Sequence, residues 1–314
     1  MISSIGGSGP VDDGPPDPQH LPVSPRSVSG EGGRLSLRST SSTVSSRESH
    51  ATSAKLSVVA AVLNEKENLE PWLQNVGWAD RIVVIDHGSE DGSRQWLEQH
   101  PQVELIDAPR GEGLIEDIRR LGLDQISEGW ILVLDLDERV TDELRQEIEQ
   151  LLESDRHESG FRIPFRHYLL GSWLRYGGWN DQHLRLFRAG LGDYIPGLIH
   201  SEATVEGAIG ELSGSVLHFA HPTIHDFLAR MNRYTSQSAE SLARGEVGGL
   251  RKRAMLRQSR WSWFRASASM FWVRYIKDRG FRDGMPGFVV AVLLSAYIFI
   301  EQAKAWEVRL EKEA

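Results

Sequence analysis

Residues 130–140 read WILVLDLDERV, an apolar run that ends in three carboxylates. The first five residues are apolar, as in a strand that is buried on both faces. Asp135, Asp137 and Glu138 then follow within four residues. Because like charges at this spacing repel one another, they require either a cationic partner between them or exposure of all three to water.

Strand-like and helix-like segments alternate on both sides of this run. Apolar strands that alternate with helices are typical of an α/β fold, in which helices cover both faces of a mainly parallel sheet. Thr141 is the predicted N-cap of the helix after the fourth strand. The apolar segments that are followed by helix-length segments span residues 56–63, 81–86, 103–108 and 130–135.

The pattern changes at about residue 160. Residues 160–174 and 182–190 indicate shorter strands, so we expect the sheet to be mixed. The pattern is helical from residue 221 to the end, with expected breaks at Gly248-Gly249 and near Gly284-Pro286. The predicted parts are a disordered Ser/Pro/Gly-rich tail over residues 1–54, an α/β domain over residues 55–220, and a helical, basic C-terminal region over residues 221–314.

Composition narrows the class of protein. The chain has 314 residues, of which 40% are hydrophobic, enough for one large domain with an appendage. The absence of cysteine excludes disulfides and thiolate-bound metals. The net charge is −9, yet residues 226–283 contain 13 Lys or Arg against 5 Asp or Glu. A basic segment on an acidic protein indicates an anionic partner for that segment.

The basic segment also interleaves its Lys and Arg with Trp, Phe and Tyr, a composition suited to an anionic membrane surface. Two other interpretations are a helical pair that packs on the main domain and a nucleic-acid site. We expect no nucleic acid, because the carboxylate pattern is the stronger signal. The N-terminus lacks a secretory signal, and the 14-residue apolar run Gly287–Ile300 falls short of the roughly 20 residues of a membrane span. We therefore expect a cytoplasmic protein at the inner face of the cell membrane.

Polar residues follow three of the predicted strands. Ligands of open α/β sheets bind at the carboxyl ends of the strands. Asn64 and Glu65 follow the first strand, Asp86 ends the second, and Asp135 and Asp137 follow the fourth. The first strand is not followed by G-x-G-x-x-G or G-K-S/T, which argues against a dinucleotide site and a P-loop.

A pocket lined by carboxylates needs a counter-charge before it can hold a nucleotide diphosphate. Asp137, assisted by Asp135, could hold Mg²⁺ or Mn²⁺, because both ions prefer hard oxygen ligands. Such an ion would also offset the repulsion between the three acids. The alternative is that this acidic stretch caps the next helix, whose N-terminus attracts negative charge.

Six motifs in the chain resemble, in the same order, those of the inverting family 2 glycosyltransferases. The resemblance covers about residues 55–310 and implies the Rossmann-like GT-A fold. The last three motifs resemble those of lipopolysaccharide inner-core β-1,4-glucosyltransferases. The implied reaction transfers a sugar, expected to be glucose, from a UDP-sugar to a lipopolysaccharide-core or other glycolipid or polysaccharide acceptor. The motifs are SVVAAVLNEKENL, ADRIVVIDHGSEDGS, WILVLDLDERV, GGWNDQHLRLFRAG, IHSEATVEG and MNRYT.

The resemblance also implies roles for single residues. Glu65 and Asp86, with Asn64 beside them, would contact the uracil and ribose of the donor. Asp135 would lie near the ribose and the metal, and Asp137 would bind the metal. The chain departs from the family at Ser201, where glutamate is usual and Glu202 comes one place later, and at Leu136 and His87, where alanine and serine are usual.

An inverting transfer needs one base to accept the proton of the acceptor hydroxyl. Asp181, in GGWNDQHLRLF, is the first candidate. The alternative is that it is only a turn residue, because Asn-Asp pairs favour turns. Glu202 and His200 are the other candidates. We expect His200 and His218 to have structural roles in preference to catalytic ones. Trp179 could either stack on a sugar ring or pack within the protein.

A function from a different class remains open at the level of sequence. Because Ser201 stands where the family has glutamate, the chain could instead be a catalytically silent partner that binds nucleotide sugars in a polysaccharide assembly.

Overall fold

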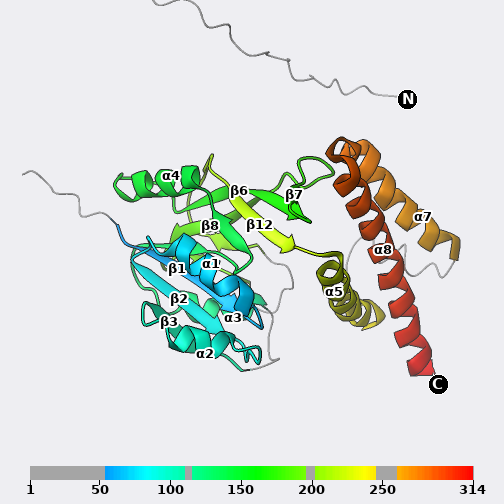
Figure 1. Cartoon of the computed structure of the whole chain (residues 1–314), viewed down its shortest axis with the longest axis horizontal. Coiled ribbons are helices and arrows are strands. Elements are labelled where there is room, and N and C mark those ends of the chain that lie inside the picture. The colour runs from blue at the N-terminus through cyan, green and yellow to red at the C-terminus, as the bar shows by residue number, and fades with distance from the viewer. Residues whose placement is uncertain (1–53, 110–114, 196–201, 245–259, 314) are drawn as a thin grey trace, which may run out of the picture. The chain divides into compact units, whose positions relative to one another are not determined.

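A computed structural model describes residues 54–109, 115–195, 202–244 and 260–313 (Figure 1). Three expectations from the sequence concern residues outside these ranges: the N-terminal tail up to residue 53, the candidate base His200 with Ser201, and the break at Gly248-Gly249. The basic residues 251–257 also lie outside them.

The described residues form an α/β structure with a helical C-terminal region. The strands are β1 Leu56–Val62, β2 Arg81–Asp86, β3 Val103–Asp107, β4 Trp130–Val133, β5 Glu138–Val140, β6 Gly160–Leu169, β7 Ser172–Trp173, β8 Gln182–Arg188, β9 Gly192–Asp193, β10 Thr204–Val205, β11 Ile209–Glu211 and β12 Val216–His221. The α-helices are α1 Lys66–Val76, α2 Ser93–Glu98, α3 Ile115–Leu123, α4 Asp142–Leu152, α5 Ile224–Arg244, α7 Arg260–Phe271 and α8 Gly284–Glu313. A π-helical turn, η1 Trp272–Lys277, and a 3₁₀ turn, η2 Gly280–Asp283, join α7 to α8.

The main sheet has the strand order β3-β2-β1-β4-β8-β6-β12-β5. Strands β1 to β4 pair in parallel, whereas β8 is antiparallel to both of its neighbours. Side chains of β1 alternate between two cores: Val58 packs with α1 and α4, and Val59 packs with α3. Helices therefore cover both faces, and the predicted mixed α/β sheet is confirmed.

The structure differs from the sequence-based expectation around the acidic stretch. β4 ends at Val133 in the middle of the sheet, and the next three-residue strand, β5, pairs with β12 at the far edge. The chain therefore crosses the end of the sheet between residues 133 and 138, and this crossing contains Asp135 and Asp137. β6 is also longer than expected, at ten residues, because its second half forms new pairs with β7 and β12.

The C-terminal helices pack on the end of β6. Leu169 and Leu174, at and after the end of that strand, form a core with Met231 of α5 and Val290 of α8. α8 begins at Gly284, at the expected break. The segment Gly280–Leu310 is long and apolar enough to cross a membrane, with a mean hydropathy of 1.8 and 22% of its apolar window buried. From the sequence this region is expected to be too short for a membrane span, because only the uninterrupted apolar run Gly287–Ile300 is counted there.

Candidate active site

The loops after β1 and β2 are tied together at the carboxyl end of the sheet. Asn64 has a left-handed backbone (φ 57°), and its side-chain oxygen accepts a hydrogen bond from the backbone of Glu90 at 2.7 Å. Asp86 is buried and accepts from the backbone of Ser89 at 3.2 Å. Glu65 lies between these residues and the acidic stretch. Burial, followed by repulsion from Asp137, raises its pKa to about 7.

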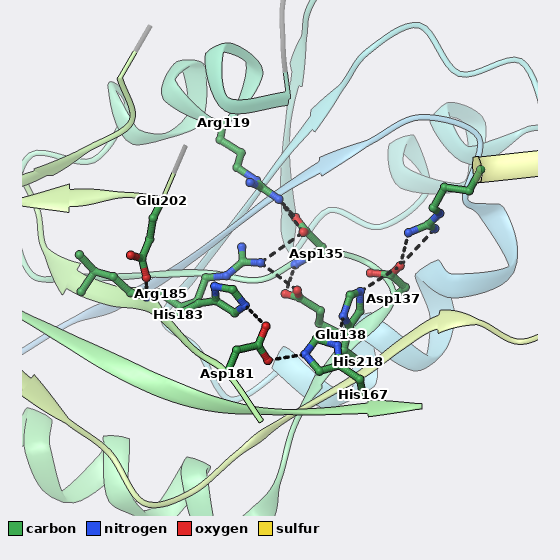
Figure 2. Close-up of polar contacts among 12 residues, drawn as sticks. Arg119, Asp135, Asp137, Glu138, His167, Asp181, His183, Arg185, Glu202 and His218 are labelled. Atoms are coloured by element: carbon green, nitrogen blue, oxygen red, sulfur yellow. Dashed lines mark hydrogen bonds and ion pairs between the residues drawn. The ribbon is translucent and has the colours of Figure 1, made fainter. Parts of the chain in front are cut away.

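Arginine side chains offset the repulsion between the carboxylates of the acidic stretch (Figure 2). Arg119 donates to both oxygens of Asp135 at 2.5 Å. Arg185 lies between two of the acids, 2.9 Å from Glu138 and 3.5 Å from Asp135. Burial acts to raise the pKa of Asp135, but the two guanidinium groups outweigh it and lower that pKa. Asp135 and Glu138 are thus neutralised by the protein itself.

Asp137 has weaker and longer contacts. The nitrogens of Arg230 lie 3.3 and 3.4 Å from its Oδ2, and Nε2 of His218 lies 3.6 Å from the same atom. The Asp137 residue is only 8% exposed. Burial acts to raise the pKa of Asp137, but the imidazole and the guanidinium hold it well below its usual range. Such long contacts can be exchanged for a ligand.

Ligand atoms of Asp137, Glu138 and His218 all lie within 4.8 Å of one another. Glu138 is committed, because Arg185 donates to one of its oxygens and the backbone of Asp135 donates to the other. The carboxylate of Asp137 and the imidazole of His218 therefore remain as candidate donors for a divalent cation. The sequence predicts His218 as a structural histidine and does not place it near Asp137, because only the pairing of β12 with β5 brings the two residues together.

Asp181 belongs to a chain of hydrogen bonds that leads to the same place. Its two oxygens contact Nε2 of His167 at 2.6 Å and Nε2 of His183 at 3.1 Å. Nδ1 of His167 then lies 3.0 Å from Nδ1 of His218, which faces Asp137. Burial acts to raise the pKa of Asp181, but the two histidines hold it well below its usual range. This carboxylate is therefore more than a turn residue.

The family model described as glycosyl transferase family 2 matches residues 57–195. The match includes the residues at the three strand ends and Asp181. Residues 57–195 therefore form a glycosyl transferase family 2 domain. The chain is a glycosyltransferase. Its mixed, mainly parallel sheet with a helical C-terminal region agrees with the fold class that the sequence predicted.

Relatives are similar over most of the transferase. The lipopolysaccharide core biosynthesis glycosyltransferase LpsC of Rhizobium meliloti (strain 1021) is 26% identical over 80% of this chain and 92% of its own length. An uncharacterized glycosyltransferase of Rickettsia typhi is 24% identical over 82% of this chain and 88% of its own. Among solved structures, the mannosyltransferase PcManGT from Pyrobaculum calidifontis, in complex with GDP-Man and Mn²⁺, is 15% identical with a TM-score of 0.47, covering 81% of this chain and 87% of that one. S. aureus TarS 1-349 is 14% identical with a TM-score of 0.44, covering 79% and 90%.

The other candidate base of the transferase, Glu202, is already paired. Arg162 contacts both of its oxygens, and the backbone of Leu184 donates to one of them at 2.9 Å. Burial acts to raise the pKa of Glu202, but these donors lower it. Its role as the base therefore gains no support from this geometry.

Trp179 lines a cavity of 260 Å³ together with His167 and His218. These two histidines contact Asp181 and Asp137, respectively. The ring of Trp179 lies 5.3 Å from that of His167. Arg230 and Val290 close other parts of the wall, so the cavity lies between the end of the sheet and helices α5 and α8. An aromatic wall next to a candidate base has the character of a sugar-binding surface.

Proposed function

We propose that the chain is a metal-dependent, inverting glycosyltransferase that moves a sugar, expected to be glucose, from a UDP-sugar to a lipopolysaccharide-core or other glycolipid or polysaccharide acceptor. The observation that carries this proposal is the row of contacts from Asp181 to Asp137. Hydrogen bonds join Asp181 to His167 and His167 to His218, and His218 lies 3.6 Å from Asp137. This row of contacts joins a candidate base to a candidate cation site. The name of the relative LpsC supports the acceptor class.

On the donor side, Glu65, Asp86 and Asn64 would bind the nucleoside, with Asp135 near the ribose. Asp137 and His218 would hold Mg²⁺ or Mn²⁺. When bound, the cation supplies positive charge that stabilises the departing UDP. Arg119 and Arg185 keep the neighbouring acids neutralised, so that the nucleotide does not meet unpaired carboxylates.

On the acceptor side, Asp181 would take the proton of the attacking hydroxyl. The acceptor oxygen forms its bond to the anomeric carbon while the bond from that carbon to the UDP oxygen breaks. The configuration at that carbon therefore inverts in a single displacement. His167 and His183 fix the orientation of the carboxylate, and each oxygen keeps a further lone pair for the substrate.

His183 offers a second arrangement of the same groups. An aspartate that contacts one ring nitrogen of a histidine orients the imidazole to act as the base through its other nitrogen. The side chain of His183 is 38% exposed, so that substrate could reach it. Asp181 would then be a positioning residue.

We also propose that the enzyme works in the cytoplasm at the inner face of an anionic membrane, where a lipid-anchored acceptor would be presented. Eleven of the large apolar side chains that are exposed among the described residues lie between residues 261 and 310, which supports a membrane location. The proposed partners are thus a UDP-sugar, a glycolipid or polysaccharide acceptor and the membrane surface.

The deciding experiment incubates the full chain with a panel of radiolabelled nucleotide sugars, Mn²⁺ and a lipid extract. Asp137→Asn keeps the shape of the side chain but removes its charge, so it should abolish transfer and the Mn²⁺ dependence of UDP binding. Asp193→Asn, in an exposed ion pair with Arg120, is the matched control. UDP affinity that ignored both Mn²⁺ and Asp137→Asn would rule out the metal site.

A further inference from the structure

The turn between α7 and α8 exposes apolar and basic side chains together. Trp272 is 62% exposed and Met285 is 70% exposed. We call this turn the docking corner; its exposed apolar residues are Trp272, Ile276, Phe281, Met285 and Phe288, and its exposed basic residues are Lys277, Arg279 and Arg282. Aromatic side chains and long basic side chains in one place suit the boundary between lipid headgroups and acyl chains.

The exposed charge of the docking corner is mainly positive, although Asp278 and Asp283 are partly exposed. Asp283 turns inward, where it accepts hydrogen bonds from the backbone N–H groups of Arg175 at 3.2 Å and Tyr176 at 2.9 Å. Lys277, Arg279 and Arg282 remain exposed to solvent. The corner therefore presents positive charge, which is complementary to anionic lipid headgroups.

The same corner holds the loop that leads to Asp181. The backbone N–H of Gly177 donates to the carbonyl of Asp278 at 2.7 Å. Arg274 donates to the carbonyls of Gly177 and Gly178 at 2.9 and 3.0 Å. Both glycines have positive φ, 74° and 78°, which lets the two carbonyls meet one guanidinium. Residues 175–178, which precede Trp179, are thus bonded to the corner, and π-helical turns such as η1 often occur at functional sites.

Polar contacts hold α8 along the protein and not across a bilayer. Ser238 of α5 donates to Glu301 of α8. Lys304 of α8 donates to the backbone of Asn232 at 2.7 Å and to Thr235 at 2.9 Å. If α8 crossed the hydrocarbon, these charges and the polar face of α5 would have to enter lipid, which is expensive.

We propose that the docking corner binds the surface of an anionic lipid bilayer and that binding there orders residues 174–181 beside the acceptor. This inference deepens the proposed function and rests on it for the identity of the substrate that the membrane presents. The bilayer is the partner because it alone combines negative charge with an apolar layer a few ångströms below the headgroups. Neither the binding of the docking corner to the bilayer nor the ordering of residues 174–181 requires substrate, so both can be measured without it.

The first test is co-sedimentation of the full chain with vesicles of phosphatidylcholine alone or with added phosphatidylglycerol. The wild type should bind the anionic vesicles at low salt. The triple variant Trp272→Ser, Phe281→Ser, Met285→Ser should bind at least tenfold more weakly. The control Leu121→Ser, Ile209→Ser replaces two exposed apolar residues away from the corner, Ile209 beside the opposite end of β6, and should bind like the wild type.

The second test is hydrogen exchange of residues 174–181 with and without anionic vesicles. Vesicles should slow exchange in the wild type. Asp283→Ala removes the bonds from Arg175 and Tyr176 but keeps the exposed side chains, so it should still bind vesicles and show less slowing than the wild type. If this variant kept the slowing, the coupling between corner and loop would be overturned.

Two further outcomes would overturn the docking itself. One is a triple variant that sediments like the wild type, or a wild type that ignores anionic vesicles at low salt. The other is a wild type that is dimeric by size-exclusion chromatography and becomes monomeric in the triple variant, which would make the corner an interface between copies. Neither result depends on transfer, so a failed nucleotide-sugar panel and a failed docking test are distinguishable.

Discussion

Asp135 and Asp137, two residues apart, are neutralised in different ways. Arg119 contacts both oxygens of Asp135 at 2.5 Å, which is a charge-assisted pair of the strong kind. The contacts of Arg230 and His218 with the carboxylate of Asp137 are longer, at 3.3 Å and 3.6 Å. Of the two acids, Asp137 is therefore the one whose cationic neighbours a metal ion could replace at low cost.

Asp181→Asn tests the base at the scale of one residue. The amide keeps the size of the side chain but cannot accept a proton at neutral pH. Losing a general base typically lowers the rate by a factor of about 10²–10⁴. We expect kcat on a soluble acceptor to fall by that factor while the Kd of UDP is unchanged, because the proposed role of Asp181 is toward the acceptor.

The pH profile distinguishes Asp181 from His183 as the base. A carboxylate with a lowered pKa stays ionised from about pH 5 to pH 8, so activity that depends on it is not lost over that range. An imidazole base accepts a proton only in its unprotonated form, so it would give the profile an acid limb. Glu65 also titrates nearby, so the wild-type profile is compared with that of His183→Gln. Disappearance of an acid limb in His183→Gln would assign the base to the imidazole.

Glu65 gives the stability a pH dependence of defined sign. Burial raises its pKa from 4.5 to about 7 in the folded chain. Its contribution to stability is present below the unfolded pKa and is lost as the pH rises through about 7. Glu65→Gln should therefore match the wild type at low pH and exceed it above pH 7, by about 1–3 kcal/mol.

Urea unfolding at several pH values measures this difference directly. Asp137 and Asp181 have lowered pKa values, so their contribution to the free energy of unfolding is lost on acidification. Because this loss occurs in both proteins, it cancels in the comparison. A difference between Glu65→Gln and wild type that stayed constant with pH would contradict the raised pKa.

At the scale of elements, local patterns predicted those features whose causes are local. The N-cap Thr141 accepts a hydrogen bond from the backbone of Leu144 at 3.3 Å, as expected from its place before an amphipathic helix. The contact between His167 and His218 joins residues 51 positions apart, and it exists only because β6 pairs with β12. Periodicity contains no information about such pairings, so the histidines of the site were not predicted.

Gly214→Ala tests how β12 is seated. A Cβ at Gly214 would overlap the backbone of Leu144 at the start of α4, and backbone cannot move aside as a flexible side chain can. Overpacking of this kind costs about 1–3 kcal/mol. We expect a lower urea midpoint for Gly214→Ala and little change for Gly77→Ala, whose nearest atom would be 3.2 Å away. Equal midpoints for the two variants would contradict the close packing.

At the scale of the whole chain, α5 and the docking corner connect the sheet to the C-terminal helices. α5 carries Arg230, which contacts Asp137, and Lys304 of α8 is bonded to the same helix. The C-terminal region therefore contributes to the candidate site, and it also contains the docking corner that we propose binds the membrane. From sequence it was predicted as a basic, helical region suited to an anionic membrane surface. Its contacts with residues 175–178 were not predicted, because they join distant parts of the chain.

Deletion of residues 1–53 tests the remaining part of the chain. The tail has no periodic apolar face with which to dock, so its removal should change neither the melting temperature nor turnover on a soluble acceptor. The boundary is sharp, because the backbone of Ala54 donates to Leu152 at 3.1 Å and Lys55 accepts from Trp130 at 2.8 Å. Deletion through residue 57 removes both bonds and the first two residues of β1, so it should lower the melting temperature by several degrees. A similar loss on deleting only residues 1–53 would show that the tail packs on the domain.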